Sequence, residues 1–168
     1  SGLIVALTDL VLHRACKQLR AWQQVAPCFG QLTMSVNIAA KDLGHAGLVA
    51  RVTHALVDAR LAPQCLSLEL TENILMDRLA SALPILETLR GLGIGLSVDD
   101  FGTGYSSLAH LSTLPIDSLK VDRSFIHGMR WGSKEATIVR AIVQLGNSLE
   151  KRVVAEGIET PSQFAQLR

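Results

Sequence analysis

The chain has 168 residues, of which 48% are hydrophobic and 18% charged, and its formal net charge is +1. This composition predicts one domain, or one piece of a domain, with a hydrophobic core, and it excludes an intrinsically disordered protein. Charged or polar residues interrupt every long apolar run, which excludes a membrane-spanning helix, and the small net charge gives no indication of binding to a DNA or RNA polymer or to a membrane surface.

Short apolar segments alternate with amphipathic segments along the chain. Five of the apolar segments predict strands, over residues 32–38, 66–70, 95–98, 118–121 and 153–155. Four amphipathic segments predict helices, over residues 8–25, 48–60, 83–92 and 134–149. We expect the third helix to begin near Pro84 rather than at Asp77, because proline is costly inside a helix. This alternation indicates an α/β fold with a parallel sheet.

The spacing of the predicted strands bears on the kind of sheet. The polar residues that close the strands recur at intervals of about 30 residues, the length of one βα unit. Eight such units need about 240 residues, so about five strands predict an incomplete (β/α)8 TIM-type barrel. A doubly wound open sheet, which is complete with five strands, is the structural alternative. We favour the barrel because nearly every strand ends in a chemically capable side chain, whereas an open sheet concentrates its site at one switch point.

Side chains that could carry chemistry lie at the C-terminal ends of the five predicted strands. They are Asn37, Glu69, Asp99, Asp100, Lys120, Asp122, Glu156 and Glu159. In a parallel barrel these ends open on one face, where converging carboxylates repel one another unless cations are present. Oxygen ligands without converging His or Cys favour Mg²⁺ or Mn²⁺ over zinc. An Asp-Asp pair beside acid and amide groups could bridge two such ions about 3.5–4 Å apart, one activating water and both stabilising charged oxygens, for in-line displacement at phosphorus.

The same side chains also have simpler interpretations. A single Asp or Asn at a strand end is more often a helix cap or turn residue than a ligand. Glu72 and Glu159, each taken alone, are equally consistent with exposed surface carboxylates. The whole set is harder to explain in this way, because five successive strands end in an acid, amide or amine. Lys120 would then orient the water or the phosphate, and a further glutamate could act as base.

The cysteines and histidines show no pattern typical of a metal site. Cys16, Cys28 and Cys65 form no CxxC pair and have no zinc-ligand spacing with histidine, so we expect reduced, structurally inert thiols in a cytoplasmic protein. The five histidines also lack ligand spacing, and we expect them at the surface of helices or loops. These are His13, His45, His54, His110 and His127.

Residues 100–107, Asp-Phe-Gly-Thr-Gly-Tyr-Ser-Ser, form the most distinctive segment of the sequence. Gly102 and Gly104 permit a positive φ and the close approach of a ligand. The Asp-Phe-Gly tripeptide also occurs in protein kinases, but no Gly-rich loop, strand lysine or His-Arg-Asp loop precedes it here.

Five motifs, in order over essentially the whole chain, resemble those of the EAL domain, a family of bacterial cyclic di-GMP phosphodiesterases. They are Ser-Val-Asn-Ile (35–38), Leu-Glu-Leu-Thr-Glu (68–72), Val-Asp-Asp-Phe-Gly-Thr-Gly-Tyr-Ser-Ser-Leu (98–108), Leu-Pro-Ile-Asp-Ser-Leu-Lys-Val-Asp (114–122) and Val-Ala-Glu-Gly-Ile-Glu-Thr (154–160). The resemblance implies a (β/α)8 barrel that hydrolyses one phosphodiester bond of cyclic di-GMP to linear pGpG with two Mg²⁺ or Mn²⁺ ions.

The resemblance also implies a role for each matching residue. The metal ligands would be Asn37, Glu69, Asp99 and Asp100. Lys120 matches the lysine that positions the nucleophilic water, and Asp122 matches the acid beside it. Glu156 matches a glutamate that acts as general base or as metal ligand in the family. Glu159 matches the residue that supports this glutamate. The segment that couples the metal site to dimerisation would comprise Glu72 and the loop of Phe101, Gly102, Thr103, Gly104 and residues 105–107.

The family pattern extends beyond both ends of the sequence. The Glu-Ala-Leu strand that names the family is expected before residue 2, and the Gln-Gly-Tyr strand is expected after residue 168. We therefore expect residues 1–168 to be a partial EAL-type domain. Taken alone, this part of the domain is expected to have impaired activity. We also expect a homodimer, and sensory or cyclase domains attached in a cytoplasmic or membrane-anchored parent protein.

Two other functions fit parts of the sequence. A non-catalytic cyclic di-GMP receptor or interaction module with the same fold would be marked by degenerate metal ligands, whereas the ligands here are intact. An unrelated metal-dependent barrel enzyme, such as a glycerophosphodiesterase, would be expected to bring converging histidines.

Overall fold

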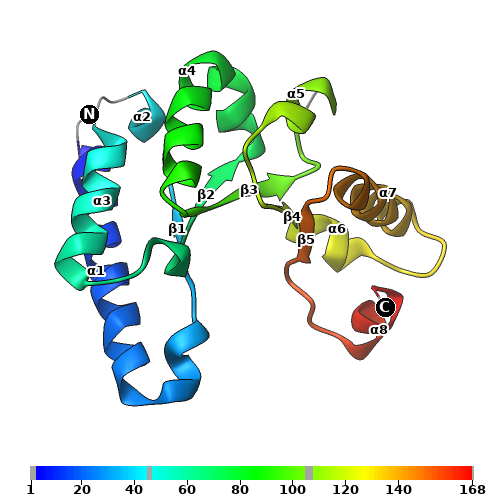
Figure 1. The fold of residues 1–168 in the computed structure, drawn as a ribbon. Helices are drawn as coiled ribbons and strands as arrows, with labels where there is room; N and C mark the ends of the chain where they lie inside the picture. The colour runs from blue at the N-terminus through cyan, green and yellow to red at the C-terminus, as the bar shows by residue number, and fades with distance from the viewer. Residues whose placement is uncertain (1–2, 45–46, 105–107, 168) are drawn as a thin grey trace. The chain divides into compact units, whose positions relative to one another are not determined.

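A computed structural model describes residues 3–44, 47–104 and 108–167 of the chain. Helices and strands alternate along it (Figure 1). The elements are α1 (Leu3–Val25), the 3-10 turn η1 (Pro27–Gln31), β1 (Met34–Asn37), α2 (Ala40–Leu43), α3 (Leu48–Ala59), η2 (Pro63–Cys65), β2 (Leu66–Thr71), α4 (Glu72–Gly91), β3 (Gly95–Phe101), α5 (Leu108–Thr113), β4 (Ser118–Val121), α6 (Arg123–Gly128), α7 (Lys134–Ser148), β5 (Arg152–Ala155) and α8 (Pro161–Gln166).

The five strands form one sheet in the order β1-β2-β3-β4-β5. The pairs β1–β2, β3–β4 and β4–β5 are parallel. All five predicted strands are therefore confirmed, and so is the parallel α/β fold. A doubly wound sheet needs a point at which the strand order reverses, and this sheet has none. The strand order thus favours the barrel over the doubly wound alternative.

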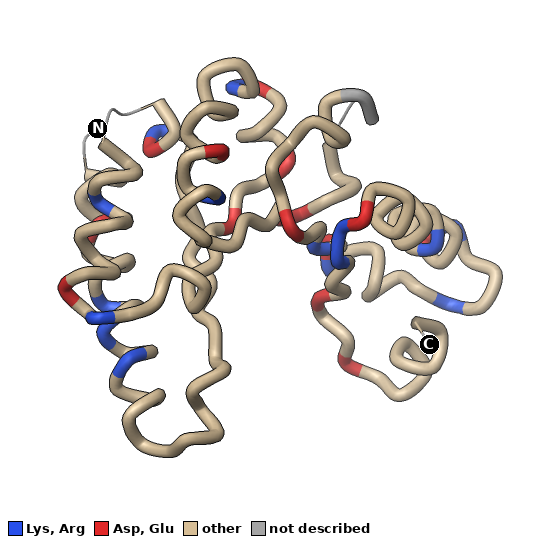
Figure 2. The backbone as a smooth tube through the Cα atoms, viewed as in Figure 1, with Lys and Arg blue, Asp and Glu red and all other residues tan. Residues whose placement is uncertain are grey.

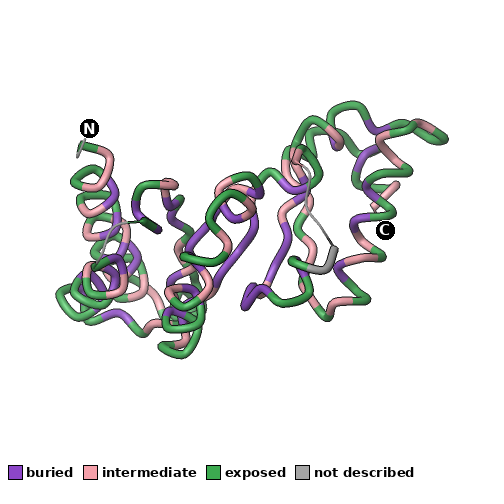
Figure 3. Tube along the Cα trace, turned by 90° about the horizontal axis from the view of Figure 1, so that it is seen from above, coloured by how far each residue is buried: buried purple, intermediate pink, exposed green. Residues whose placement is uncertain are grey.

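The chain divides into two compact units. The first comprises Ser1–Leu70 and Ile74–Leu96, and the second comprises Thr71–Asn73 and Ser97–Arg168. In the first unit α1 packs against α3, and the two helices lie side by side (Figure 1). In Figure 3 the helix that follows the N-terminus carries buried segments between exposed ones. The buried residues of α1 recur every three or four positions, as one face of a helix requires: Thr8, Leu12, Cys16 and Leu19.

A buried ion pair joins the helices of the first unit. Asp42 is fully buried at the end of α2, and its Oδ1 lies 2.7 Å from Nη2 of Arg51 on α3. Thr8 of α1 donates its hydroxyl to the other oxygen of Asp42 at 2.8 Å. Each oxygen of this buried carboxylate therefore has a partner, as burial of a charge requires.

In the second unit α7 lies close against β5. Gly146 of α7 has no room for a side chain, because a Cβ there would collide with Val153 of β5. The apolar residues Val139 and Ile142 of the same helix are buried, as is Leu119 of β4. Close packing of helix on strand therefore depends on a glycine at position 146.

The prediction that the third helix begins near Pro84 was wrong. The helix α4 begins at Glu72 and contains Pro84, and it is interrupted at Arg78, where φ is −127° and ψ is 18°. Leu75 before this kink and Leu86 after it are both fully buried. Burial of apolar side chains on both sides of the kink outweighs the one helical hydrogen bond that proline removes.

No helix among the described residues is both long and apolar enough to cross a membrane. Lys and Arg are interspersed with Asp and Glu along the described backbone (Figure 2).

Candidate active site

The predicted ligands fall into two groups, one in each unit. In the first unit, Asn37 and Glu69 lie opposite each other at the C-terminal ends of the parallel strands β1 and β2. The backbone N–H of Ile38 donates to the carbonyl oxygen of Glu69 at 2.8 Å, which fixes this register. The register thus brings an exposed amide beside Glu69, which is only 7% exposed.

In the second unit, a β-bulge positions Asp99 and Asp100. β3 pairs with β4 in register up to Val98 and again from Phe101, with one residue fewer on β4 than on β3 between these points. Asp100 takes up the extra length in a left-handed conformation with φ 53°, which aspartate tolerates better than most residues. A bulge redirects side chains that would otherwise alternate strictly between the two faces of a strand.

Lys120 connects two of the predicted carboxylates. Its Nζ lies 3.2 Å from Oδ1 of Asp99 and 2.7 Å from Oε1 of Glu156. These three residues come from β3, from β4 and from the segment after β5. Lys120 and Asp99 are mostly shielded from solvent, whereas the side chain of Glu156 is 42% exposed. The structure thus brings together an ammonium group and two carboxylates from three successive strand ends, with one carboxylate accessible to water.

Asp100 and Asp122 form a second pair of carboxylates. Partial burial raises the pKa of Asp100, and the charge of Asp99, a hydrogen bond with Asp122 and the charges of Asp122 and Glu156 raise it further. The pKa of Asp122 is lowered, first of all by the hydroxyl of Ser124, which donates to it. The two carboxyl groups therefore differ in proton affinity, and Asp100 is the one that holds a proton more readily.

Asp122 is also the N-cap of α6, since its Oδ1 accepts the backbone N–H of Ser124 at 2.8 Å. The simpler interpretation of a strand-end acid as a helix cap is therefore correct for this residue. Capping fixes one oxygen of Asp122 and does not prevent its contact with Asp100.

Glu72 holds the loop that follows β3. Its side chain is 2% exposed, and Oε2 accepts the backbone N–H groups of Gly102 at 2.8 Å and of Gly104 at 3.3 Å. Thr103 donates its hydroxyl to the backbone carbonyl of Asp100 at 2.8 Å. Glu72 is thus not the exposed carboxylate of the simpler interpretation. The remaining loop positions of the predicted segment, Tyr105, Ser106 and Ser107, lie outside the described residues.

Glu159 has a different environment from Glu156. Its side chain is 65% exposed, and Oε2 lies 3.8 Å from Nδ1 of His127. Its backbone N–H donates to Oε1 of Gln163 in α8. Glu159 is therefore an exposed surface carboxylate, as the simpler interpretation has it.

The donor atoms at the strand ends suit a hard cation. Asn37, Glu69, Asp99 and Asp100 offer amide and carboxylate oxygens, the ligands that Mg²⁺ and Mn²⁺ prefer. Burial first of all, and then the charges of Asp99, Asp122 and Glu156, raise the pKa of Asp100, so like charges lie near one another in the second-unit group. A divalent cation would relieve this repulsion, so the chemistry of these donor atoms fits such an ion. Among the described residues, however, no third carboxylate brings a ligand atom within 4.8 Å of those of both Asp99 and Asp100.

Sequence reasoning missed one group of potential ligands in the first unit. His13 on α1 and His54 on α3 lie together with Asp58, although the expectation was that the histidines form no ligand group. His54 is exposed, as expected. His45, another of the five histidines, lies outside the described residues. The signals available in the sequence were the spacings Asp9–His13 and His54–Asp58, each of four residues along a helix.

Comparison with known proteins places these observations in a family. The EAL domain model matches residues 1–168. The cyclic di-GMP phosphodiesterase NbdA of Pseudomonas aeruginosa is 49% identical over 168 residues, which are 100% of this chain and 21% of NbdA. The bifunctional diguanylate cyclase/cyclic di-GMP phosphodiesterase MucR of the same species is 45% identical over 163 residues, or 97% of this chain and 24% of MucR.

The fold is also similar to solved structures. The c-di-GMP complex of the PaMucR phosphodiesterase matches with a TM-score of 0.91 and 45% identity, over 99% of this chain and 71% of that chain. Because this structure and other EAL structures are similar to the chain, the five-stranded sheet belongs to a TIM-barrel type of fold. The chain itself spans about a quarter or less of the length of the two curated relatives.

Proposed function

The chain belongs to the EAL domain family, and on that premise we propose that it hydrolyses cyclic di-GMP to linear pGpG. The observation that carries the proposal is the ion-pair chain Asp99–Lys120–Glu156, which joins three strand ends of the second unit. The phosphodiesterase names of relatives at 49% and 45% identity support the same activity.

Metal binding is part of the proposal. Asn37, Glu69, Asp99 and Asp100 would hold Mg²⁺ or Mn²⁺ as two ions. When bound, such ions supply the positive charge that lowers the pKa of a water molecule and neutralises the phosphate oxygens.

Two side chains of the chain itself, Lys120 and Glu156, would take part in proton transfer and charge stabilisation. In the reaction, water adds to phosphorus, the bond from phosphorus to the 3′ oxygen breaks, and the 3′ oxygen takes up a proton. Glu156, partly exposed and oriented by Lys120, would accept the proton of the attacking water as general base. Lys120, held by two carboxylates, would place its positive charge beside the water or the phosphate.

Asp122 and Glu72 would act through their neighbours. Asp122 accepts the hydrogen bond of Asp100 and so biases where the proton of this pair resides. Glu72 fixes the loop from Phe101 to Gly104, directly after the bulge. Glu159 would support the segment that carries Glu156. We further propose that this loop couples the metal site to the interface of a homodimer. The chain would be located in the cytoplasm, attached to sensory or cyclase domains of its parent protein.

A turnover assay tests the function. Because residues 1–168 are expected to have impaired activity by themselves, the assay uses the parent protein that carries them. It is incubated with cyclic di-GMP and Mn²⁺, pGpG is followed by chromatography, and EDTA removes the metal in a parallel sample. We expect metal-dependent pGpG formation that Asp99→Asn abolishes, while Glu87→Gln, a change at an exposed acid of α4, leaves it unchanged. Binding of cyclic di-GMP without turnover would instead establish the non-catalytic receptor, and absence of both would overturn the proposal.

A further inference from the structure

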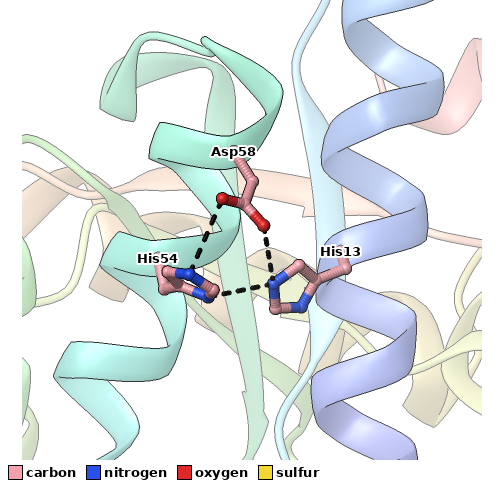
Figure 4. Close-up of side chains that lie close together, drawn as sticks. All are labelled: His13, His54 and Asp58. Carbon is pink, nitrogen blue, oxygen red and sulfur yellow. Dashed lines mark hydrogen bonds and ion pairs between the residues drawn. The ribbon is translucent and has the colours of Figure 1, made fainter.

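We propose that His13, His54 and Asp58 form a second metal site, selective for Zn²⁺ and similar late transition metals. Figure 4 shows the three side chains converging between α1 and α3. His13 Nε2 lies 3.3 Å from His54 Nδ1 and 3.6 Å from Asp58 Oδ2, and His54 Nε2 lies 3.6 Å from Asp58 Oδ1. Among the described residues, no other three His, Cys, Asp or Glu side chains bring ligand atoms within 4.8 Å of one another.

The packing of two helices holds these ligands in place. His54 and Asp58 are four residues apart on α3, so they share one face of that helix. His13 comes from α1, where the residues beside it, Leu12 and Cys16, are fully buried. The site is therefore anchored by the core of the first unit, and its ligands do not depend on a loop.

A hydrogen bond prepares His13 for coordination. Nδ1 of His13 lies 2.9 Å from the backbone carbonyl oxygen of Asp9, which can only accept, so Nδ1 carries the proton. The lone pair of the neutral ring is then on Nε2, the atom that faces His54 and Asp58. A ligating histidine almost always has such a partner on its other nitrogen, because that bond fixes the tautomer and the orientation of the ring.

The two separations measured from His13 Nε2 match the geometry of a tetrahedral ion. With Zn–N and Zn–O bonds of about 2.0–2.2 Å, neighbouring ligand atoms in a tetrahedron are roughly 3.3–3.6 Å apart. His13 Nε2 lies 3.3 Å from His54 Nδ1 and 3.6 Å from Asp58 Oδ2, and both separations are within this range. The separation of 3.6 Å between His54 and Asp58 joins the other nitrogen of His54 to the other oxygen of Asp58. One ligand atom from each of the three residues lies within 4.8 Å of the other two. Three protein ligands leave a fourth position for water, and the exposed side of His54 gives an ion access from solvent.

The donor set distinguishes this site from the strand-end site. Two imidazoles and one carboxylate favour zinc, nickel or copper, whereas Asn37, Glu69, Asp99 and Asp100 offer oxygen only. An ion bound to the histidine site would connect α1 to α3 and stabilise the folded first unit by mass action.

A Zn²⁺ titration tests the site. The exposed thiol of Cys28 is alkylated beforehand so that it cannot bind the metal. Isothermal titration calorimetry then measures Zn²⁺ binding to the protein, and Co²⁺ replaces Zn²⁺ in a second titration that follows the visible absorption of a tetrahedral ion. We expect one equivalent of Zn²⁺ to bind, and a rise in the melting temperature with Zn²⁺ but not with Mg²⁺.

Three variants define the outcome. His54→Ala should weaken Zn²⁺ binding by at least about tenfold, and Asp58→Asn, which keeps the side-chain shape, should weaken it as well. His110→Ala, a change at an exposed histidine of α5, is the matched control and should bind as the unchanged protein does. Absence of binding, or equal binding by His54→Ala, would show that the three side chains form only an ion-pair cluster. Neither result depends on cyclic di-GMP turnover, so this site and the proposed function can fail separately.

Discussion

The carboxylate of Glu72 accepts the backbone N–H of Gly102 at 2.8 Å, so the first residue of α4 holds the loop that follows β3. The same oxygen accepts the N–H of Gly104 at 3.3 Å. A Cβ at Gly104 would lie 2.9 Å from the other oxygen of Glu72, so the loop approaches this carboxylate too closely for a larger residue. The conformation of the loop beside Asp99 and Asp100 therefore depends on a buried acid from another element.

Replacing Glu72 should loosen this loop. Glu72→Ala leaves two backbone N–H groups without their acceptor, and we expect the free energy of unfolding to fall by about 1–3 kcal/mol. Glu72→Gln keeps an oxygen acceptor but loses the charge, so its effect should be smaller. Urea unfolding measures both, with Asp77→Ala at an exposed position of α4 as the control. Equal stability of all three variants would contradict the role given to Glu72.

Lys120 should be needed for turnover more than for folding. In Lys120→Met the side chain keeps a similar length but loses the charge that lies between Asp99 and Glu156. We expect pGpG formation to fall by at least about 10²-fold, the usual loss when one preorganised charge-stabilising group is removed. Circular dichroism should show an unchanged fold. Lys17→Met, at an exposed position of α1, should retain full activity.

Asp100 should make the metal-free protein less stable at neutral pH. Because its pKa is raised in the folded state, folding disfavours the ionised form, and this cost appears as pH rises above the ordinary aspartate pKa of about 3.9. Asp100→Asn removes the charge and tolerates the same left-handed backbone. The variant should therefore melt at a higher temperature than the unchanged protein at pH 7 in EDTA. The difference should vanish near pH 3, and a difference independent of pH would refute this explanation.

The three thiols should differ in reactivity. Burial raises the pKa of the Cys16 thiol to about 11, so only about a thousandth of it is thiolate at pH 8. Cys28 is exposed and Cys65 is half-buried. Iodoacetamide followed by peptide mass spectrometry should show rapid labelling of Cys28 in native buffer and labelling of Cys16 only after denaturation. Equal rates for Cys16 and Cys28 in native buffer would contradict the burial of Cys16.

The order of elements could be predicted because it depends on local patterns. A β-strand buried on both faces needs a continuous apolar run, and each of the five runs forms a strand. Helix boundaries were less predictable. Pro84 is unfavourable in an isolated helix, but burial of Leu75 and Leu86 keeps residues on both sides of the kink helical. That burial comes from tertiary packing, which local propensity does not contain.

The parallel α/β fold, the family and the residue types at the strand ends follow from periodicity and short motifs, which can be read along the chain. Which side chains meet depends on tertiary packing. The bulge at Asp99 and Asp100 arises from how β3 pairs with β4, and Lys120 contacts Glu156, which is 36 residues further along the chain, because their strands are neighbours. His13 and His54, 41 residues apart, come together because the apolar faces of α1 and α3 pack against each other. Contacts between distant residues follow from the burial of those faces, and no local pattern in the sequence specifies them.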